Sequence, residues 1–165
     1  MSNTHTYQSR LSWEGSTAAG YDAYDRTHSM QVPPAEVELT LSSDPAFSGD
    51  PRLANPEQLL LAAASSCQLL MFLAIAARSR VDVIAYEDDA DAIMPKDSRP
   101  MRITRITLRP HITIASDGDI ERAQRMVERA HDGCFIANTL NAEITVEPGI
   151  QRAATTEVDS TRPRS

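Results

Sequence analysis

Two cysteines are the residues of this chain best suited to covalent chemistry. Cys67 lies in the middle of an apolar run over 59–77, and Cys134 opens a short segment that ends at residue 140. A free cysteine is most often a small packed hydrophobe, and burial raises the pKa of a thiol. A reactive Cys67 therefore needs a cation brought to it by another part of the fold. If the short segment is helical, its free N–H groups favour a Cys134 thiolate. The spacing leaves open whether the two sulfurs meet.

Other chemistries find little support in the residue pattern. There is no C-x-x-C pair, and two thiols do not complete a tetrahedral zinc site. The chain also lacks a glycine-rich phosphate loop and a G-x-S-x-G elbow. We therefore expect no metal and no organic cofactor. The histidines, none paired at ligand spacing, are His5, His28, His111 and His131.

Composition narrows the class of partner. The chain has 165 residues and a formal net charge of −7, with no cluster of Lys or Arg. Nucleic acids and anionic membranes both require clustered cations, so neither is expected as a partner. Residues 1–10 lack the apolar core of a signal peptide, which predicts a cytoplasmic protein with reduced thiols. The run 59–77 approaches transmembrane length, but Ser65, Ser66 and Gln68 interrupt it and favour a buried helix.

The first half of the chain predicts strands followed by a long helix. Period-two alternation over 7–13 and 36–41 is typical of strands. Asn55 is a good N-cap, and Pro56 suits the first helical position. The helix that follows is apolar almost all round, so we expect it to be buried on every side. A domain this small needs a sheet, a second chain or both to surround such a helix, which predicts a homodimer.

The second half alternates between strand and helix patterns. Strands are predicted over 81–92 and 101–114, a helix over 120–130 ended by Gly133, and a closing strand over 142–146. From residue 149 the chain is polar without periodicity, which predicts a disordered tail over 149–165. The class is α+β, with one domain over 1–148. Four residues at even spacing should share the buried face of a strand: Ile106, Leu108, Ile112 and Ile114.

The helix start carries a family resemblance. The stretch Asn55-Pro56-Glu57-Gln58-Leu59-Leu60, running on to Ala64-Ser65-Ser66-Cys67, resembles the N-P-E-[EQ]-L…A-x-C signature of the OsmC/Ohr family, the osmotically inducible and organic hydroperoxide resistance proteins. The match extends to Gly133-Cys134, Asn138 and the closing strand. It covers nearly the whole chain, from about residue 7 to residue 147.

The resemblance implies an intertwined homodimer of α+β subunits, with long central helices wrapped by antiparallel sheets and active sites at the subunit interface. It assigns the peroxidatic role to Cys67 and the resolving role to Cys134. The family's glutamate corresponds to Glu57. Its activating arginine, in the second N-terminal strand, points to Arg26, with Arg10 as the fallback. Many members carry a proline after the second cysteine, where this chain has Phe135, and this departure bears on the pocket wall and the substrate.

The expected activity is reduction of organic hydroperoxides under oxidative stress. Cys67 would become a sulfenic acid, Cys134 would close a disulfide, and a lipoyl-type dithiol would reduce it. Glu57 would orient Arg26 through a bidentate pair. Glu57 and Cys67 are about 15 Å apart along a straight helix, so a bend, the reach of Arg26 or a second chain must connect them. The alternatives are a redox-sensing or small-molecule-binding protein with little turnover, and a structural dimer with inert thiols.

Overall fold

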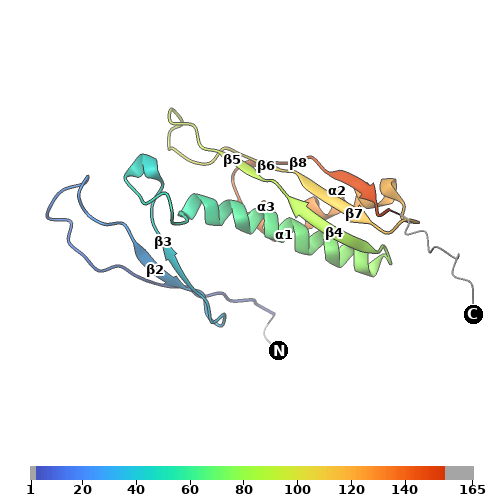
Figure 1. Cartoon of the computed structure of the whole chain (residues 1–165), viewed down its shortest axis with the longest axis horizontal. Coiled ribbons are helices and arrows are strands. Elements are labelled where there is room, and N and C mark those ends of the chain that lie inside the picture. The colour runs from blue at the N-terminus through green and yellow to red at the C-terminus, as the bar shows by residue number, and fades with distance from the viewer. Residues whose placement is uncertain (1–2, 155–165) are drawn as a thin grey trace, which may run out of the picture. The chain divides into compact units, whose positions relative to one another are not determined.

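The computed structural model describes residues 3–154 (Figure 1). The chain forms two compact units, one up to Leu60 and one from Leu61 onward. The single domain expected over 1–148 stays a prediction. The boundary between the two units lies inside the long helix α1 (Pro56–Arg78). The presence of α1 confirms the predicted long helix. Each unit has its own strands.

The first unit contains a three-stranded antiparallel sheet in the order β1-β2-β3. Arg10 pairs with Gln31 in one ladder, and His28 pairs with Leu41 in the other. The predicted strands at 7–13 and 36–41 are confirmed, although both are shorter than expected. The elements of this unit are β1 (Arg10–Ser12), β2 (His28–Gln31), β3 (Glu38–Leu41) and the short 3-10 helix η1 (Pro45–Phe47).

A reciprocal cap starts α1. The Gln58 backbone N–H donates to Asn55 Oδ1 at 2.9 Å, and the Asn55 N–H donates to Gln58 Oε1 at 3.0 Å. This is a capping box, in which two otherwise unpaired donors of the first turn are satisfied. Pro56 follows as the first helical residue, where its missing N–H costs nothing. The predicted N-terminus of the helix is therefore confirmed.

Helix α1 is buried along one stripe only. Its buried residues are four apart and lie on one face: Ala64, Gln68, Phe72 and Ala76. Leu70 is 62% exposed and Leu73 is 37% exposed. The prediction of burial on every side is therefore wrong for this chain by itself. By length and composition α1 is apolar enough to cross a membrane, with a mean hydropathy of 2.1 in its most apolar window.

The second unit has two three-stranded sheets in the orders β4-β7-β9 and β5-β6-β8. They are built from three long strand segments, each interrupted once. Two helices separate the second segment from the third (Figure 1). The elements are β4 (Val83–Asp88), β5 (Asp91–Ile93), β6 (Arg105–Leu108), β7 (Pro110–Ile114), α2 (Ile120–Gly133), α3 (Phe135–Thr139), β8 (Glu143–Val146) and β9 (Gly149–Arg152).

Two predictions for this unit were wrong. The sheets are not wholly antiparallel, because β6 pairs with β8 and β7 pairs with β9 in parallel. The intervening helices make the crossover that parallel pairing requires. Strand β9 also lies where we predicted a disordered tail, since the ladder with β7 orders a segment that has little hydrophobic signal of its own. The rest of the predicted tail, 155–165, lies outside the described residues.

The core of the second unit joins α1, α2 and β7. Ile106, Leu108, Ile112 and Ile114 are each at most 1% exposed, which confirms the shared buried face predicted for them. Gly133 is the last residue of α2 and is not among the residues with positive φ, so it is not the left-handed cap that we expected. The buried cluster consists of Phe72, Ala76, Ile112, Ile114, Ala123, Met126, Val127 and Ala130.

Candidate active site

The two cysteine thiols are neighbours in the second unit. Cys67 is half-buried in the middle of α1, and Cys134 is 1% exposed at the junction of α2 and α3. Burial raises the pKa of the Cys134 thiol, and both a hydrogen bond with Cys67 and the charge of Cys67 raise it further. Both cysteines are free. Residues 67 positions apart in sequence therefore form a thiol pair.

The short helix α3 acts on Cys134 as the sequence suggested, but with a different net result. Cys134 is the N-cap of α3, and the Ala137 N–H donates to its Sγ at 3.5 Å. This hydrogen bond lowers the pKa of the thiol, and a second one from Ile136 does the same. Burial outweighs both, so the pKa of Cys134 lies above its ordinary value. Cys134 is therefore a protonated thiol near neutral pH.

Polar side chains near the pair include two that sequence reasoning missed. Gln68, fully buried beside Cys67, donates from Nε2 to the Val127 carbonyl at 3.1 Å. Its Oε1 is buried and has no hydrogen-bond partner in the described part of the chain. The Tyr86 hydroxyl is likewise buried and unpartnered there. The pKa of Tyr86 is raised by burial, then by Asp88 and Cys134. The sequence held one signal for Gln68, which is a polar residue inside the apolar run 59–77.

A polar contact fastens α1 to the sheet near the thiol pair. Ser65, two residues before Cys67, donates from Oγ to Asp88 Oδ2 at 2.5 Å. The other Asp88 oxygen accepts from the Arg109 N–H at 2.7 Å, at the break between β6 and β7. Because Asp88 closes β4, these bonds fix the rotation of α1 over the strand. They anchor the segment of α1 that carries Cys67.

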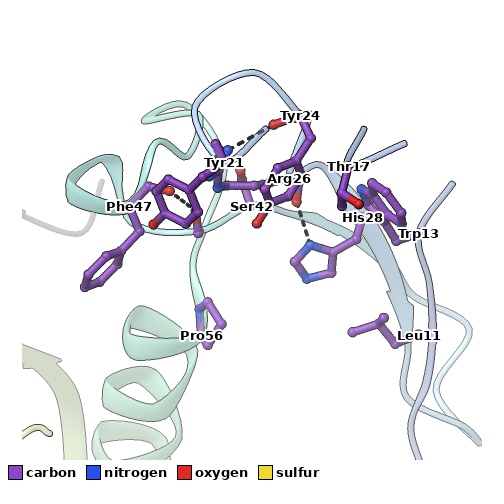
Figure 2. A pocket seen from close by; sticks show the side chains of 11 residues that line it. Leu11, Trp13, Thr17, Tyr21, Tyr24, Arg26, His28, Ser42, Phe47 and Pro56 are labelled. Carbon is purple, nitrogen blue, oxygen red and sulfur yellow. Dashed lines mark hydrogen bonds between the residues drawn. The ribbon is translucent and has the colours of Figure 1, made fainter. Parts of the chain in front are cut away.

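Arg26 lies in the first unit, two residues before β2 and not within it as we expected. It is 8% exposed. Its Nη1 donates to the Tyr24 carbonyl at 2.9 Å, and its Nη2 donates to the Tyr21 carbonyl at 2.5 Å. The guanidinium carbon lies 4.0 Å from the Tyr24 ring centroid and 4.8 Å from that of Tyr21 (Figure 2). Arg26 is thus a buried, stacked cation held by backbone carbonyls.

Arg26 belongs to the wall of a cavity of about 530 Å³. Figure 2 shows its guanidinium among aromatic side chains, with Pro56 and Leu11 also at the wall. All of the lining residues belong to the first unit: Leu11, Trp13, Thr17, Tyr21, Tyr24, Arg26, His28, Ser42, Ser43, Phe47 and Pro56. The cavity is therefore mostly apolar, with one buried positive charge.

The remaining predicted site residues are also in the first unit. Glu57 is half-buried in the first turn of α1, and Arg10 is exposed at the start of β1. Within residues 3–154, no ion pair joins Glu57 to Arg26, so the bidentate pair that we expected is not observed. The structure brings Cys67 and Cys134 together, whereas Arg26 and Glu57 share the first unit without pairing.

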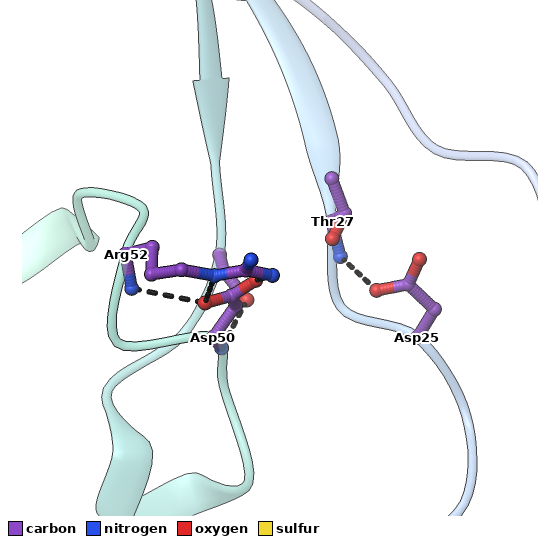
Figure 3. Close-up of polar contacts among 5 residues, drawn as sticks. Asp25, Thr27, Asp50 and Arg52 are labelled. Atoms are coloured by element: carbon purple, nitrogen blue, oxygen red, sulfur yellow. Dashed lines mark hydrogen bonds and ion pairs between the residues drawn. The ribbon is translucent and has the colours of Figure 1, made fainter.

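Arg52, in the same unit, forms an ion pair with Asp50 and provides a comparison for Arg26. It donates from Nε and Nη2 to the two oxygens of Asp50, at 3.0 and 2.7 Å (Figure 3). These hydrogen bonds, with one from the Arg52 N–H, lower the pKa of Asp50 to about 2. The Arg52 side chain is 86% exposed. Arg26 thus differs from Arg52 in being buried and having no carboxylate within ion-pair distance in the described chain.

Comparison with known proteins supports the resemblance seen in the sequence. The family of OsmC-like proteins matches residues 49–148, well over half of the chain. An OsmC-like protein of unknown function from Vibrio cholerae is 27% identical, with a TM-score of 0.80 over 88% of this chain and 100% of that chain.

More distant proteins are also similar to this chain. An organic hydroperoxide resistance protein, OsmC, from Legionella pneumophila is 16% identical, with a TM-score of 0.66 over 91% of this chain and 99% of that chain. YmaD of Bacillus subtilis is 20% identical over 152 residues, which cover 89% of this chain and 95% of that protein. The family match and the shared α+β fold confirm what the N-P-E stretch and the two cysteines suggested: this chain belongs to the family of OsmC-like proteins.

Proposed function

We propose that the chain is a thiol-dependent peroxidase that reduces organic hydroperoxides through Cys67 and Cys134. The observation that carries this proposal is the contact between two free thiols of unequal exposure. Structural neighbours that are named organic hydroperoxide resistance proteins support the choice of substrate class. The proposed chemistry needs no metal ion, because sulfur alone carries the two electrons.

The proposed cycle has three balanced steps. The Cys67 thiolate attacks the distal oxygen of R–OOH, the O–O bond breaks, and the leaving alkoxide takes a proton to become an alcohol. The sulfur is now a sulfenic acid. The Cys134 sulfur then attacks it, water leaves with the Cys134 proton, and a disulfide forms. A dithiol reductant, proposed to be lipoyl-type, supplies two electrons and two protons to restore both thiols.

The difference between the two thiols supports the order of attack. Cys67 is the more exposed of the pair, so a peroxide reaches it first. Cys134 is buried and its pKa is raised, which makes it a poor first nucleophile because the thiolate is the reactive form. Its contact with Cys67 suits it to the second step, since the sulfenic acid forms within reach of it.

Two further roles are proposed on the basis of the resemblance. Arg26 supplies the cation that a thiolate at Cys67 requires, because a guanidinium is always charged and donates through a rigid fork. Glu57 orients that arginine. Both roles require an arrangement of the two units that brings Arg26 to Cys67. Arg10, exposed on β1, remains the fallback.

We also propose that the chain acts as a cytoplasmic homodimer. The exposed face of α1, including Leu70 and Leu73, supports a second copy as its cover, because contiguous apolar surface favours association in water. The proposed partners are therefore an organic hydroperoxide, a dithiol and a second copy of this chain. No nucleic acid, membrane, metal or organic cofactor has a part in the proposed reaction.

The decisive experiment follows consumption of cumene hydroperoxide with dihydrolipoamide as reductant. Wild type is compared with Cys67→Ser, with Cys134→Ser and with Ser66→Ala, which alters an exposed neighbour on the same helix. We expect Cys67→Ser to abolish turnover and Cys134→Ser to accumulate overoxidised Cys67, with Ser66→Ala unchanged. Wild-type protein with verified reduced thiols and no turnover would overturn the proposal.

The alternative is a redox-sensing or small-molecule-binding protein with little turnover. The aromatic cavity of the first unit is the observation that favours binding. Reversible Cys67–Cys134 oxidation without multiple turnovers in the same assay would support this alternative.

A further inference from the structure

The resolving step proposed for Cys134 develops negative charge on a buried sulfur. Cys134 is 1% exposed, and burial raises the pKa of its thiol although the Ala137 and Ile136 N–H groups donate to it. Attack on the sulfenic acid needs that charge, because the thiolate is the reactive form of a cysteine. A further hydrogen-bond donor beside this sulfur would therefore speed the step.

Tyr86 carries a hydroxyl group that packing does not explain. It lies on β4 opposite Ile112, and its ring packs against Phe72 of α1 with the ring centroids 5.8 Å apart. The hydroxyl oxygen is buried and has no hydrogen-bond partner among residues 3–154. Phenylalanine would supply the same ring without the cost of an unsatisfied buried polar group. The hydroxyl therefore adds nothing to the packing of this core.

Two contacts place Tyr86 near the second cysteine. Tyr86 touches Phe72, and the preceding residue of α1, Met71, packs against Gly133. A Cβ added to Gly133 would lie 3.6 Å from the Met71 sulfur. Gly133 directly precedes Cys134. The same turn of α1 therefore contacts both the Tyr86 ring and the backbone that carries Cys134.

The Tyr86 hydroxyl can act only as a hydrogen-bond donor to a charged sulfur. Burial raises its pKa, and Asp88 and then Cys134 raise it further, so it keeps its proton over the range in which thiols ionise. The contribution of Cys134 agrees with the proximity of the two groups. A neutral O–H beside a thiolate forms a charge-assisted hydrogen bond, which is stronger than a neutral one.

We propose that Tyr86 is a catalytic residue of the resolving step and donates a hydrogen bond from its hydroxyl to the Cys134 sulfur. This role rests on the peroxidase function proposed above. The Cys134 sulfur attacks the Cys67 sulfenic acid, the S–S bond forms, the S–O bond breaks, and water leaves with the Cys134 proton. Tyr86 keeps its own proton. Its hydrogen bond increases the thiolate population more than it lowers nucleophilicity, because thiolate reactivity depends only partly on basicity.

Tyr86→Phe tests this role, because it removes only the unpartnered oxygen. Tyr7→Phe is the matched control, since Tyr7 is 90% exposed. Reduced protein is mixed rapidly with cumene hydroperoxide, and loss of peroxide and formation of the disulfide are followed separately. We expect peroxide loss within about twofold of wild type in both variants, and disulfide formation at least about tenfold slower in Tyr86→Phe alone. With excess peroxide, overoxidised Cys67 should accumulate in Tyr86→Phe.

Stability distinguishes this role from a structural one. Tyr86→Phe should be at least as stable as wild type in guanidinium denaturation, because the oxygen that it loses is buried without a partner in the described chain. A variant that resolves slowly and is equally stable is the expected result. A variant that is less stable, or does not fold, would mean that the hydroxyl has a structural partner and would overturn the inference.

The kinetics also separate this inference from the proposed function. Wild-type protein that turns over peroxide but forms the disulfide no faster than Tyr86→Phe would overturn the inference alone. Wild-type protein that does not consume peroxide would overturn the proposed function and this role with it. The donor contact has a test without peroxide, since Cys134 is the one thiol left in Cys67→Ser. We expect adding Tyr86→Phe to that variant to raise the midpoint of thiolate titration, and an unchanged midpoint would refute the contact.

Discussion

Gln68 is the residue whose replacement tests the description of the core behind Cys67. Its side chain is fully buried. Its Nε2 donates to the Val127 carbonyl, and its Oε1 has no hydrogen-bond partner among the described residues. Replacing it by methionine keeps the length of the side chain and removes both polar groups. The expected result is a more stable protein.

The magnitude follows from three contributions. Losing the Gln68–Val127 hydrogen bond costs about 1 kcal/mol, while the Val127 carbonyl keeps the intrahelical bond of an interior residue of α2. Removing an unsatisfied buried oxygen recovers roughly 1–3 kcal/mol. Burying the methionine side chain adds a smaller favourable amount. We therefore expect Gln68→Met to raise the free energy of unfolding by about 1–2 kcal/mol, in line with these hydrogen-bond magnitudes.

The assay is guanidinium denaturation at several protein concentrations, because association would make the apparent stability concentration-dependent. Gln124→Met is the matched control: it makes the same change at an exposed position of α2, and we expect it to alter stability by less than about 0.5 kcal/mol. A Gln68→Met protein that is less stable than wild type by about 1 kcal/mol or more would refute the reasoning. It would mean that Oε1 has a hydrogen-bond partner outside this chain, such as water or a second copy.

Four other outcomes are expected. The raised pKa of Cys134 means that its thiolate forms only above the ordinary range of a thiol. Ultraviolet thiolate titration should show a lower midpoint in Cys67→Ser, because Cys67 contributes to the rise; an unchanged midpoint would contradict the contact. Since the native state holds that proton more tightly than the unfolded chain, stability should fall as pH rises past the ordinary thiol pKa. Gly49→Ala should lower the free energy of unfolding, measured by urea denaturation, by at least about 2 kcal/mol. The reason is that a Cβ at this position would lie 1.7 Å from the Ser43 carbonyl oxygen. A cost below about 0.5 kcal/mol would show that this loop relaxes easily. Phe135→Pro should change thermal stability little, because position 135 is the first residue of α3, where proline is tolerated. Unfolding of the variant would show instead that the Phe135 N–H or ring is needed.

Local sequence determined much of the secondary structure. The start of α1 was predictable because the N-cap, the proline after it and the apolar run are all short-range signals, and the capping box confirms them. The buried face of β6 and β7 followed from even spacing in the same way. The family could also be inferred from sequence, because its motif is contiguous along the start of α1 up to Cys67.

Tertiary structure decided the properties that depend on distant neighbours. No spacing rule brings Cys67 to Cys134, and no local rule shows that burial outweighs the N–H groups of α3 in setting the pKa of Cys134. Strand β9 escaped prediction because its order comes from pairing with β7 and not from its own composition. Arg26 could be named as a candidate from the sequence, but only the folded first unit shows it buried against the rings of Tyr21 and Tyr24. Local patterns specify elements, whereas desolvation and charge depend on which elements meet.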